Sequence, residues 1–514
     1  MFSKTLLALT LICLPQSIAT PHEEIYTLPT GWRHVGCPPD DDTLRLQVSL
    51  KQQNLSRLDT LLRRISDPDS SCYGKYLDRD EVDALFKPSD HTKREVQAWL
   101  EGAGISRRDI HVDNHYVSFS TSARNANELL NTTFLTYTND EVQRVRAMNY
   151  FIPDSVKEHI HFVSPTTYFG GIPSHKDSER LSSRSMPSND GLSPRSEPTE
   201  IESCQTFWTP SCLRNIYNIN GYEANSSSGS RIAWGAFFNM TASYTDLEAY
   251  EELYAIPSRN FTVEVIQGGL TPQEPSAMSE HLEDLDAFTY TSLTNGQLPL
   301  IQYSVGGLAP GYIPNADGPL PEDNGNEPYL ALYTQMLGKT NAELPQVITH
   351  SYSDDEQTIP RAYAKHVCNA IGMLGLRGIT VVQTMAGAGP GTACLSNDGQ
   401  NTPRFTPQFP ASCPYVTSIG ETNQTNPLMT WNISSGGFSD YFERPSWQNE
   451  AVSTYLNHHI SPEVLRYYTP FFSATGRASP DLSLQGFLPD YQVSHWVSLI
   501  LFLIIRPHNP QIIS

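Results

Sequence analysis

Four carboxylates lie within seven residues of the stretch SEHLEDLDAF: Glu280, Glu283, Asp284 and Asp286. Glu280 and Asp284 are four positions apart, which places them on one face of a helix. Neighbouring carboxylates raise each other's pKa, so such a pair can exchange protons with a substrate below neutral pH. The alternative is a solvated acidic helix start, which the helix dipole stabilises. The residues by themselves favour this alternative.

A glycine-rich turn is the second candidate. ITVVQTMAGAGPGTAC runs from a β-branched apolar segment into a turn that contains no Asp, Glu, His or Ser. Glycines allow a backbone to approach a ligand closely, and Gly306-Gly307 ends another apolar run in the same way. No G-x-S-x-G elbow and no zinc-ligand spacing occurs, and the SSGG at 434–437 is typical of a turn rather than of a nucleophile.

Parallel strands must position these segments. Helical stretches at 327–339 and 359–378 alternate with apolar runs at 230–239, 260–269, 298–307, 344–353 and 378–387. Such alternation predicts an α/β domain with a parallel sheet and helices on both faces. Ligands bind beyond the C-terminal ends of such strands, where Gly306, Gly307 and the turn at 387–391 are expected.

The chain is long enough for two or three domains. Residues 20–169 mix strand and helix spacing and predict an α+β domain. Residues 170–200 are rich in Ser, Pro, Gly and charge and predict a cleavable linker, with basic positions at Lys176, Arg180, Arg184 and Arg195. Residues 201–493 form the predicted α/β domain.

The N-terminus predicts secretion. Residues 1–19 have the charged start, short apolar core and small-residue end of a signal peptide. Seven sequons support an extracellular protein: Asn54, Asn131, Asn225, Asn239, Asn260, Asn423 and Asn432. Of eight cysteines, Cys13 belongs to the signal, and the odd remainder leaves one unpaired or paired outside the chain. The net charge of −21 argues against nucleic acid, and no apolar run is long enough to span a membrane.

Several long phrases resemble one family. GWRHVGCPPDDDTLRLQVSL and SPTTYFGG resemble its pro-domain, while TPSCLRNIYNINGY, LPQVITHSYSDDEQTIPRAYAKHVCN, ACLSNDGQNTPRFTPQFPASCPYVTSIGET and SSGGFSDYFERPSWQ resemble its catalytic domain. The chain thus resembles the sedolisins, the serine-carboxyl peptidases, and within them the secreted tripeptidyl-peptidases of fungal type.

The resemblance implies a subtilisin-like catalytic domain that removes tripeptides from free N-termini of peptides at acidic pH. It implies a catalytic Glu, Asp and Ser, an oxyanion-hole Asp, one calcium ion near the C-terminus, and a pro-domain that acts as inhibitor and chaperone. A glutamate suits this work, because a histidine base is protonated in acid whereas a Glu of pKa about 4.3 still accepts a proton.

The sequence departs from the family pattern at three places. The E-x-x-x-D spacing is kept by Glu280 and Asp284, which we favour, whereas the Leu-Asp pair points to an alternative register with Glu283 and Asp286. The oxyanion Asp falls on Gly387. No G-T-S-A-S phrase supplies the nucleophile, and residues 494–514 form an apolar tail unlike the family, so the calcium ligands are also expected to be missing.

Two functions follow from these patterns. The first is a secreted tripeptidyl-peptidase that is impaired or inactive as this chain stands. The alternative is a non-catalytic relative that binds peptides or a partner protein, which the loss of the acid at Gly387 supports.

Overall fold

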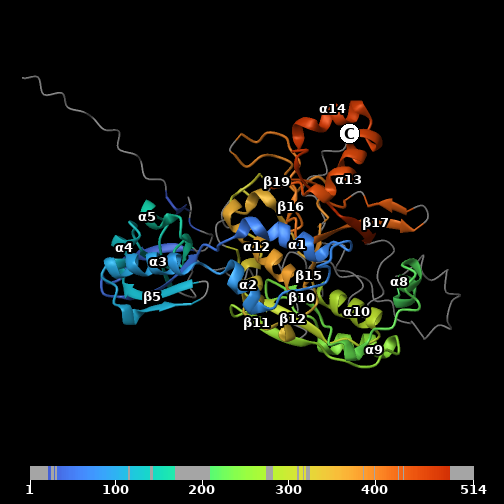
Figure 1. The fold of residues 1–514 in the computed structure, drawn as a ribbon, viewed down its shortest axis with the longest axis horizontal. Coiled ribbons are helices and arrows are strands. Elements are labelled where there is room, and N and C mark those ends of the chain that lie inside the picture. The colour runs from blue at the N-terminus through green and yellow to red at the C-terminus, as the bar shows by residue number, and fades with distance from the viewer. Residues whose placement is uncertain are drawn as a thin grey trace, which may run out of the picture. The chain divides into compact units, whose positions relative to one another are not determined.

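The computed structural model describes residues 21–24, 28, 32–113, 116–138, 143–167, 209–273, 282–309, 312–316, 318–319, 324–385, 387–398, 400–425, 428–431 and 433–486. They divide into two compact units, each of which can be followed in Figure 1. Unit 1 comprises 1–27, 31–51 and 90–167, and unit 2 comprises 28–30, 52–89 and 168–514. The predicted signal peptide, linker and apolar tail lie outside the described residues.

Unit 1 is built on an antiparallel sheet in the order β4 (Ile110–Val112), β5 (Tyr116–Ser122), β3 (Thr43–Leu50) and β9 (Ile160–Ser164). Apolar residues alternate with polar ones along β3, and its Leu46, Val48 and Leu50 are buried in one core together with residues of the flanking helices. The helices are α3 (Asp90–Gly102), α4 (Ala123–Leu129) and α5 (Asp154–Lys157). Short strands β1 (Glu23–Glu24), β2 (Arg33–Gly36), β6 (Leu135–Thr138), β7 (Gln143–Arg146) and β8 (Asn149–Tyr150) complete it.

Unit 2 contains the predicted parallel sheet. Its order is β11 (Thr262–Ile266), β12 (Leu300–Val305), β10 (Ile232–Ala236), β13 (Val347–His350), β15 (Thr380–Thr384) and β17 (Thr417–Thr425). All these pairs are parallel, and β18 (Leu428–Thr430) adds an antiparallel strand, while β21 (Leu482–Gln485) pairs with β17. All five predicted strand runs are therefore confirmed.

Two groups of helices flank this sheet. The first is α9 (Tyr244–Leu253) with α10 (Leu282–Thr294), which packs against α8 (Pro210–Ile216), and the second is α11 (Tyr329–Leu337) with α12 (Arg361–Leu376). All six residues of β12 are buried, as expected for a strand covered on both faces. The remaining elements are β14 (Asp354–Asp355), β16 (Gln408–Phe409), β19 (Gly437–Glu443), α13 (Asn449–Thr454), α14 (Pro462–Tyr468) and β20 (Gly476–Ser479).

Residues 52–89 fold with unit 2 although they lie inside the predicted pro-domain. They carry α1 (Leu58–Ser66) and α2 (Arg79–Phe86). Helix α2 begins at a capping box, in which Asp78 accepts from the Glu81 backbone and Glu81 accepts from the Asp78 backbone. The stretch at 20–169 thus contributes to both units.

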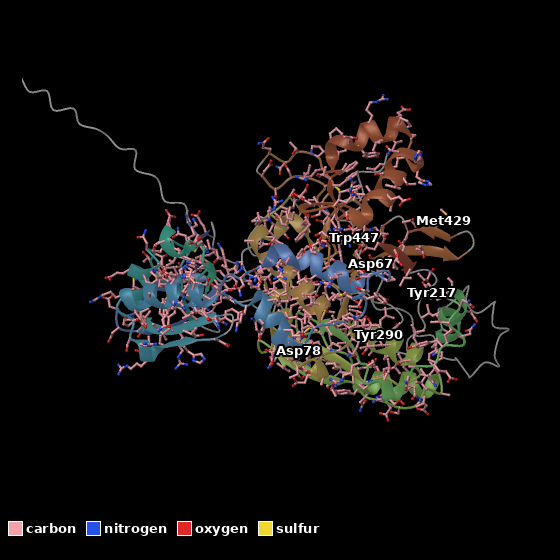
Figure 2. The ribbon with its side chains drawn as sticks, viewed as in Figure 1. Asp67, Asp78, Tyr217, Tyr290, Met429 and Trp447 are labelled. Carbon is pink, nitrogen blue, oxygen red and sulfur yellow. A yellow bond between two sulfur atoms is a disulfide. The ribbon has the colours of Figure 1, made fainter. Side chains whose placement is uncertain are left out.

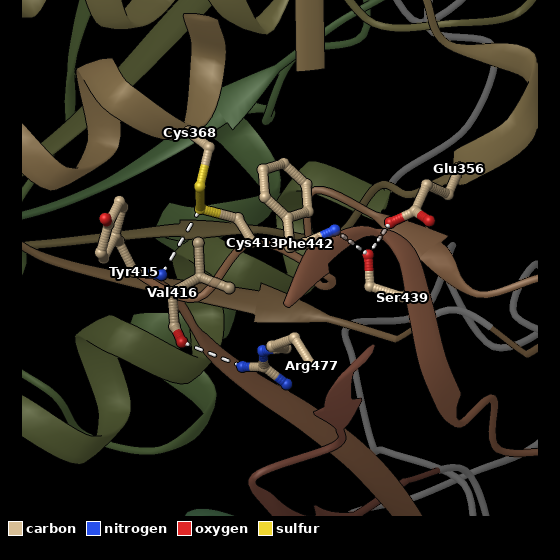
Figure 3. The surroundings of a disulfide bond; sticks show 8 residues. All are labelled: Glu356, Cys368, Cys413, Tyr415, Val416, Ser439, Phe442 and Arg477. Atoms are coloured by element: carbon tan, nitrogen blue, oxygen red, sulfur yellow. Dashed lines mark hydrogen bonds between the residues drawn. A yellow bond between two sulfur atoms is a disulfide. The ribbon is translucent and has the colours of Figure 1, made fainter. Parts of the chain in front are cut away.

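A disulfide and a buried arginine connect α12 and the later segments of unit 2 to one another. Cys368 on α12 forms a disulfide with Cys413, and Cys212 is also disulfide-bonded, whereas Cys37, Cys72 and Cys394 are free thiols. Figure 3 shows this disulfide, with the buried Arg477 beside it donating to the Val416 carbonyl at 3.3 Å. The disulfide therefore ties α12 to the segment that leads into β17.

Candidate active site

Glu283, Asp284 and Asp286 lie in the first turns of α10 and are not solvated. Glu283 and Asp284 have no exposed surface and Asp286 is 9% exposed. The alternative of a solvated acidic helix start is therefore wrong for these three residues. Glu280 lies outside the described residues, so its pairing with Asp284 stays a prediction.

Asp284 joins two helices. Its Oδ1 accepts a hydrogen bond from the Ser243 backbone at 2.6 Å. Ser243 is in turn the N-cap of α9, with its hydroxyl accepting from the Asp246 backbone at 3.1 Å. This bond ties the start of α10 to the start of α9, which follows β10 in the chain.

Glu283 and Asp286 face the end of β13 instead. The Tyr352 hydroxyl donates to Glu283 Oε1, and Glu283 Oε2 has no protein partner among the described residues. Asp286 accepts from the Tyr290 hydroxyl at 2.9 Å and from the Ser351 hydroxyl at 3.1 and 3.2 Å. Tyr290 lies one turn along α10 from Asp286 and is labelled in Figure 2. Two residues that directly follow β13 therefore position this carboxylate pair.

Burial raises the pKa of both carboxyl groups. The pKa of Asp286 rises to about 6 by desolvation, which the Tyr290 and Ser351 hydrogen bonds partly oppose. The pKa of Glu283 lies well above its usual value, first through desolvation and then through the charge of Asp286, while the Tyr352 hydrogen bond opposes the rise. Such a pair holds a proton at mildly acidic pH and can pass it to a neighbouring group.

A second carboxyl pair lies beside the first. Glu327 and Asp354 are 4% and 6% exposed, and the Glu327 backbone donates to Asp354 Oδ2 at 3.3 Å. Desolvation raises the pKa of Glu327 to about 7 and that of Asp354 well above its usual range. The Tyr329 hydroxyl, two residues from Glu327, donates to the Tyr352 carbonyl at 3.0 Å and so connects the two pairs.

Glu356 is a further buried acid near this edge. Its carboxylate accepts from the Ser439 hydroxyl at 2.6 Å and from the Asp440 backbone at 2.8 Å, and the Ser439 contact is drawn in Figure 3. Desolvation raises its pKa to about 7. Sequence reasoning missed Glu327, Asp354 and Glu356, and the only available signal was the acidic run Asp354-Asp355-Glu356 directly after a predicted strand.

The glycine-rich turn follows β15 at the same edge of the sheet. Ser435 accepts from the Ala388 backbone at 2.9 Å, and Gly389 donates to the Ile433 carbonyl at 2.8 Å. Gly391 has φ +138°, and a Cβ there would lie 1.8 Å from Thr406 Oγ1. The predicted turn at 434–437 therefore supports the loop of Gly387, which sequence reasoning did not anticipate.

Gly306 and Gly307 follow β12. A Cβ on Gly306 would lie 2.7 Å from the Gln267 carbonyl oxygen and 2.7 Å from the Gly269 nitrogen, so packing alone requires glycine at this position. Gly307 has φ +86°, a conformation that also favours glycine. Their predicted contact with substrate stays a prediction.

No group of three or more His, Cys, Asp or Glu side chains among the described residues could hold a metal ion. The acids described above therefore do not fit the calcium ion that the family resemblance implies, and the expected loss of the family's calcium ligands stays a prediction. In the part of the chain that the structure describes, every helix is too short or too polar to cross a membrane.

Comparisons with known proteins agree along most of the chain. The family model described as "Pro-kumamolisin, activation domain" matches residues 30–169. The tripeptidyl-peptidase sed4 of Aspergillus fumigatus is 40% identical over 494 residues, which cover 96% of this chain and 81% of the relative. The tripeptidyl-peptidase SED2 of Arthroderma otae is 31% identical over 498 residues, which cover 94% of this chain and 81% of the relative.

A solved structure is also similar. The Pseudomonas sedolisin, described as a serine-carboxyl proteinase, matches with a TM-score of 0.36 and 15% identity. The match covers 55% of this chain and 71% of the solved chain.

Proposed function

Because the chain belongs to the sedolisin family of tripeptidyl-peptidases, we propose that it receives the N-terminal end of a peptide at the sheet edge where β10, β12, β13 and β15 end. The single observation that carries this proposal is the buried pair Glu283 and Asp286, held by Tyr352, Tyr290 and Ser351 at that edge.

Within this site we assign proton transfer to Glu283 and Asp286. Glu283 has one carboxylate oxygen without a partner among the residues that the structure describes, which suits a base that accepts a proton from a nucleophile. Asp286 is held by two hydroxyl donors, which suits a residue that orients and stabilises the base. Asp284 is engaged by the Ser243 backbone, which argues for a structural role.

We further propose that turnover by this chain is strongly reduced. Gly387 offers a backbone N–H but no acid where the family resemblance implies an oxyanion Asp, and the sequence contains no G-T-S-A-S phrase. The loss of one oxyanion-hole donor lowers turnover by about 10²–10³-fold in a well-studied serine protease. Gly387 also favours the second candidate function, which is peptide binding without cleavage.

A chimera tests both candidates. Residues 1–486 are joined to the C-terminal segment of the Aspergillus fumigatus relative, which supplies that protein's own final residues, and release of a tripeptide-anilide product is followed at pH 4 to 6. We expect low but measurable activity that rises about 10²-fold or more on Gly387→Asp. Glu283→Gln and Asp286→Asn should remove it, whereas Asp440→Asn, which changes a half-buried acid outside the pair, serves as the matched control.

Two outcomes would reject the proposed peptidase. The first is a folded chimera that stays silent with and without Gly387→Asp but still binds the peptide, which supports the peptide-binding alternative. The second is activity that survives both Glu283→Gln and Asp286→Asn, which would mean that the proposed pair does not transfer the proton.

We also propose that the protein is extracellular. Four of the predicted glycosylation positions are exposed: Asn54, Asn131, Asn225 and Asn260. Asn239 is half-buried, and its side-chain amide oxygen accepts a hydrogen bond from the Leu270 backbone. A mature N-terminus at residue 20 in the medium of a secreting host, and a mass shift on deglycosylation, are the expected results.

A further inference from the structure

Residues 52–89, here called the strap, lie on helix α12 of unit 2. Three glycines on or just after α12 allow this close approach. A Cβ on Gly372 would lie 2.9 Å from Leu58, one on Gly375 would lie 3.0 Å from Leu62, and one on Gly378 would lie 2.9 Å from Tyr76. Figure 2 shows the strap, marked by its labelled Asp67 and Asp78, over the helices of this unit.

Hydrogen bonds fix the strap at the end of α12. The Leu77 backbone donates to the Leu376 carbonyl at 2.8 Å, which satisfies one of the carbonyls that every helix end leaves open. The Asn341 side chain donates to the Leu77 carbonyl at 2.9 Å, and Arg377 donates to Asn341 Oδ1 at 2.8 Å. The middle of the strap is therefore bound through its own backbone.

Helix α1 makes a second set of contacts. Leu58 is fully buried, and the Arg63 guanidinium lies 4.9 Å from the centre of the Trp447 ring and also donates to Ser446. Gln52 donates to the sulfur of Met373 at 3.6 Å. These contacts extend the attachment from the N-terminal end of the strap to its middle.

The two ends of the strap meet each other. Gln53 donates its backbone N–H to the Phe86 carbonyl at 3.2 Å, and the Asn54 side chain donates to the Leu85 carbonyl at 2.8 Å. The strap is thus a closed loop: the chain leaves unit 1 after residue 51 and returns to it at residue 90. Hydrogen bonds as well as the covalent chain therefore hold its two ends together.

From this geometry we propose that the α12 surface is a docking site for the strap, and that the strap stays bound to unit 2 after its covalent links to unit 1 are cut. The activation region would then not be removed as one body, because residues 52–89 remain as a bound chain on the peptidase unit. The proposal does not depend on catalytic activity of the site described above.

The test uses the full chain with one specific protease sequence inserted between residues 51 and 52 and another between 89 and 90. After complete cleavage at neutral pH, size-exclusion chromatography and mass spectrometry locate the 38-residue fragment 52–89. We expect it to elute with unit 2. Elution of a free strap while unit 2 stays folded would overturn the proposal.

Two variants locate the docking contact. Gly375→Leu adds a side chain that meets Leu62 while it raises the helix propensity of α12, so unit 2 should fold and retain the strap about tenfold less tightly or worse. Gly325→Leu is the matched control, because no atom lies within 4 Å of a Cβ there. Leu58→Ala should also release the strap, whereas Thr60→Ala, an exposed neighbour on α1, should not. Equal retention of the strap in Gly375→Leu and Gly325→Leu would contradict the proposed contact.

Discussion

At the scale of single residues, Tyr352 lowers the proton affinity of Glu283, which burial and the charge of Asp286 raise. Its hydroxyl donates to the carboxylate and so opposes the rise in the pKa of Glu283 that burial causes. In the active chimera, Tyr352→Phe should therefore raise that pKa further and move the acidic limb of the kcat/KM profile to higher pH. Tyr333→Phe is the control, since that buried hydroxyl contacts His350 instead. An unchanged acidic limb would argue that Glu283 is not the base.

The buried acids also show which features of the site the sequence could not predict. The E-x-x-x-D spacing favoured Glu280 with Asp284, whereas the Leu-Asp pair pointed to Glu283 with Asp286. All three described acids are buried, so only the partners of the side chains distinguish Asp284 from Glu283 and Asp286. Acidic clusters are commonly solvated, which is why the solvated alternative was favoured. Glu327 and Asp354 are 27 residues apart in the sequence, so nothing local indicated that their carboxylates meet.

At the scale of elements, the glycine-rich turn depends on one conformation. Gly391 combines φ +138° with a Cβ position 1.8 Å from Thr406, so Gly391→Ala should lower the free energy of unfolding of unit 2 by about 2 kcal/mol or more. Urea unfolding followed by tryptophan fluorescence measures this loss. Gly325→Ala, at an open position, should change it by less than about 1 kcal/mol. A loss no larger at Gly391 than at Gly325 would mean that the turn can rearrange.

The helices and strands of unit 2 are the features that the sequence predicted best. The runs of β10, β11, β12, β13 and β15, and the helices α11 and α12, follow directly from apolar periodicity, because each has one dominant buried pattern. Leu58, Leu61, Leu62 and Ile65 likewise follow helical spacing with an apolar face, and they lie in α1. Periodicity does not say which partner covers such a face, so the division of the pro-region between two units was not predictable.

At the scale of the whole molecule, the two units should respond to acid in opposite ways. Unit 2 buries Asp286, Glu327 and Glu356, whose pKa values are raised to about 6, 7 and 7. A raised carboxyl pKa means that the folded state holds protons more tightly than the unfolded state. The resulting stability is present below about pH 4, the ordinary carboxyl range, and is lost as the pH rises through 6 to 7. His350 of β13, whose pKa burial lowers to about 3, opposes part of this gain in acid, but it is one group against three carboxyl groups.

Unit 1 contains half-buried histidines beside lysines. Desolvation, with Lys51 and His22 nearby, lowers the pKa of His161 to about 4, and burial also lowers that of His22, close to Lys157 and Lys51. A lowered histidine pKa gives stability that is present above about pH 6.5 and is lost as the pH falls through 4. Glu23, whose pKa burial raises, opposes part of this loss.

Hydrogen exchange of the intact chain at pH 7 and pH 4, corrected for the intrinsic exchange rate, measures the protection of backbone amides in both units in one sample. We expect protection in β3, β5 and β9 to decrease at pH 4 while protection in β10, β12 and β13 increases. His161→Gln should weaken the acid response of unit 1 alone, and His458→Gln, on an exposed helical turn of unit 2, is its control. Parallel changes in the two units would contradict this assignment.

The attachment of α1 to α12 also has a consequence for the order of synthesis. Roughly 300 residues separate the two helices, and a ribosome that adds about 5–20 residues per second needs about 15–60 s to make them. Throughout that interval the apolar face of α1, which begins at the buried Leu58, has been made but α12 has not. A nascent chain of this protein should therefore depend on a chaperone between the emergence of these two helices.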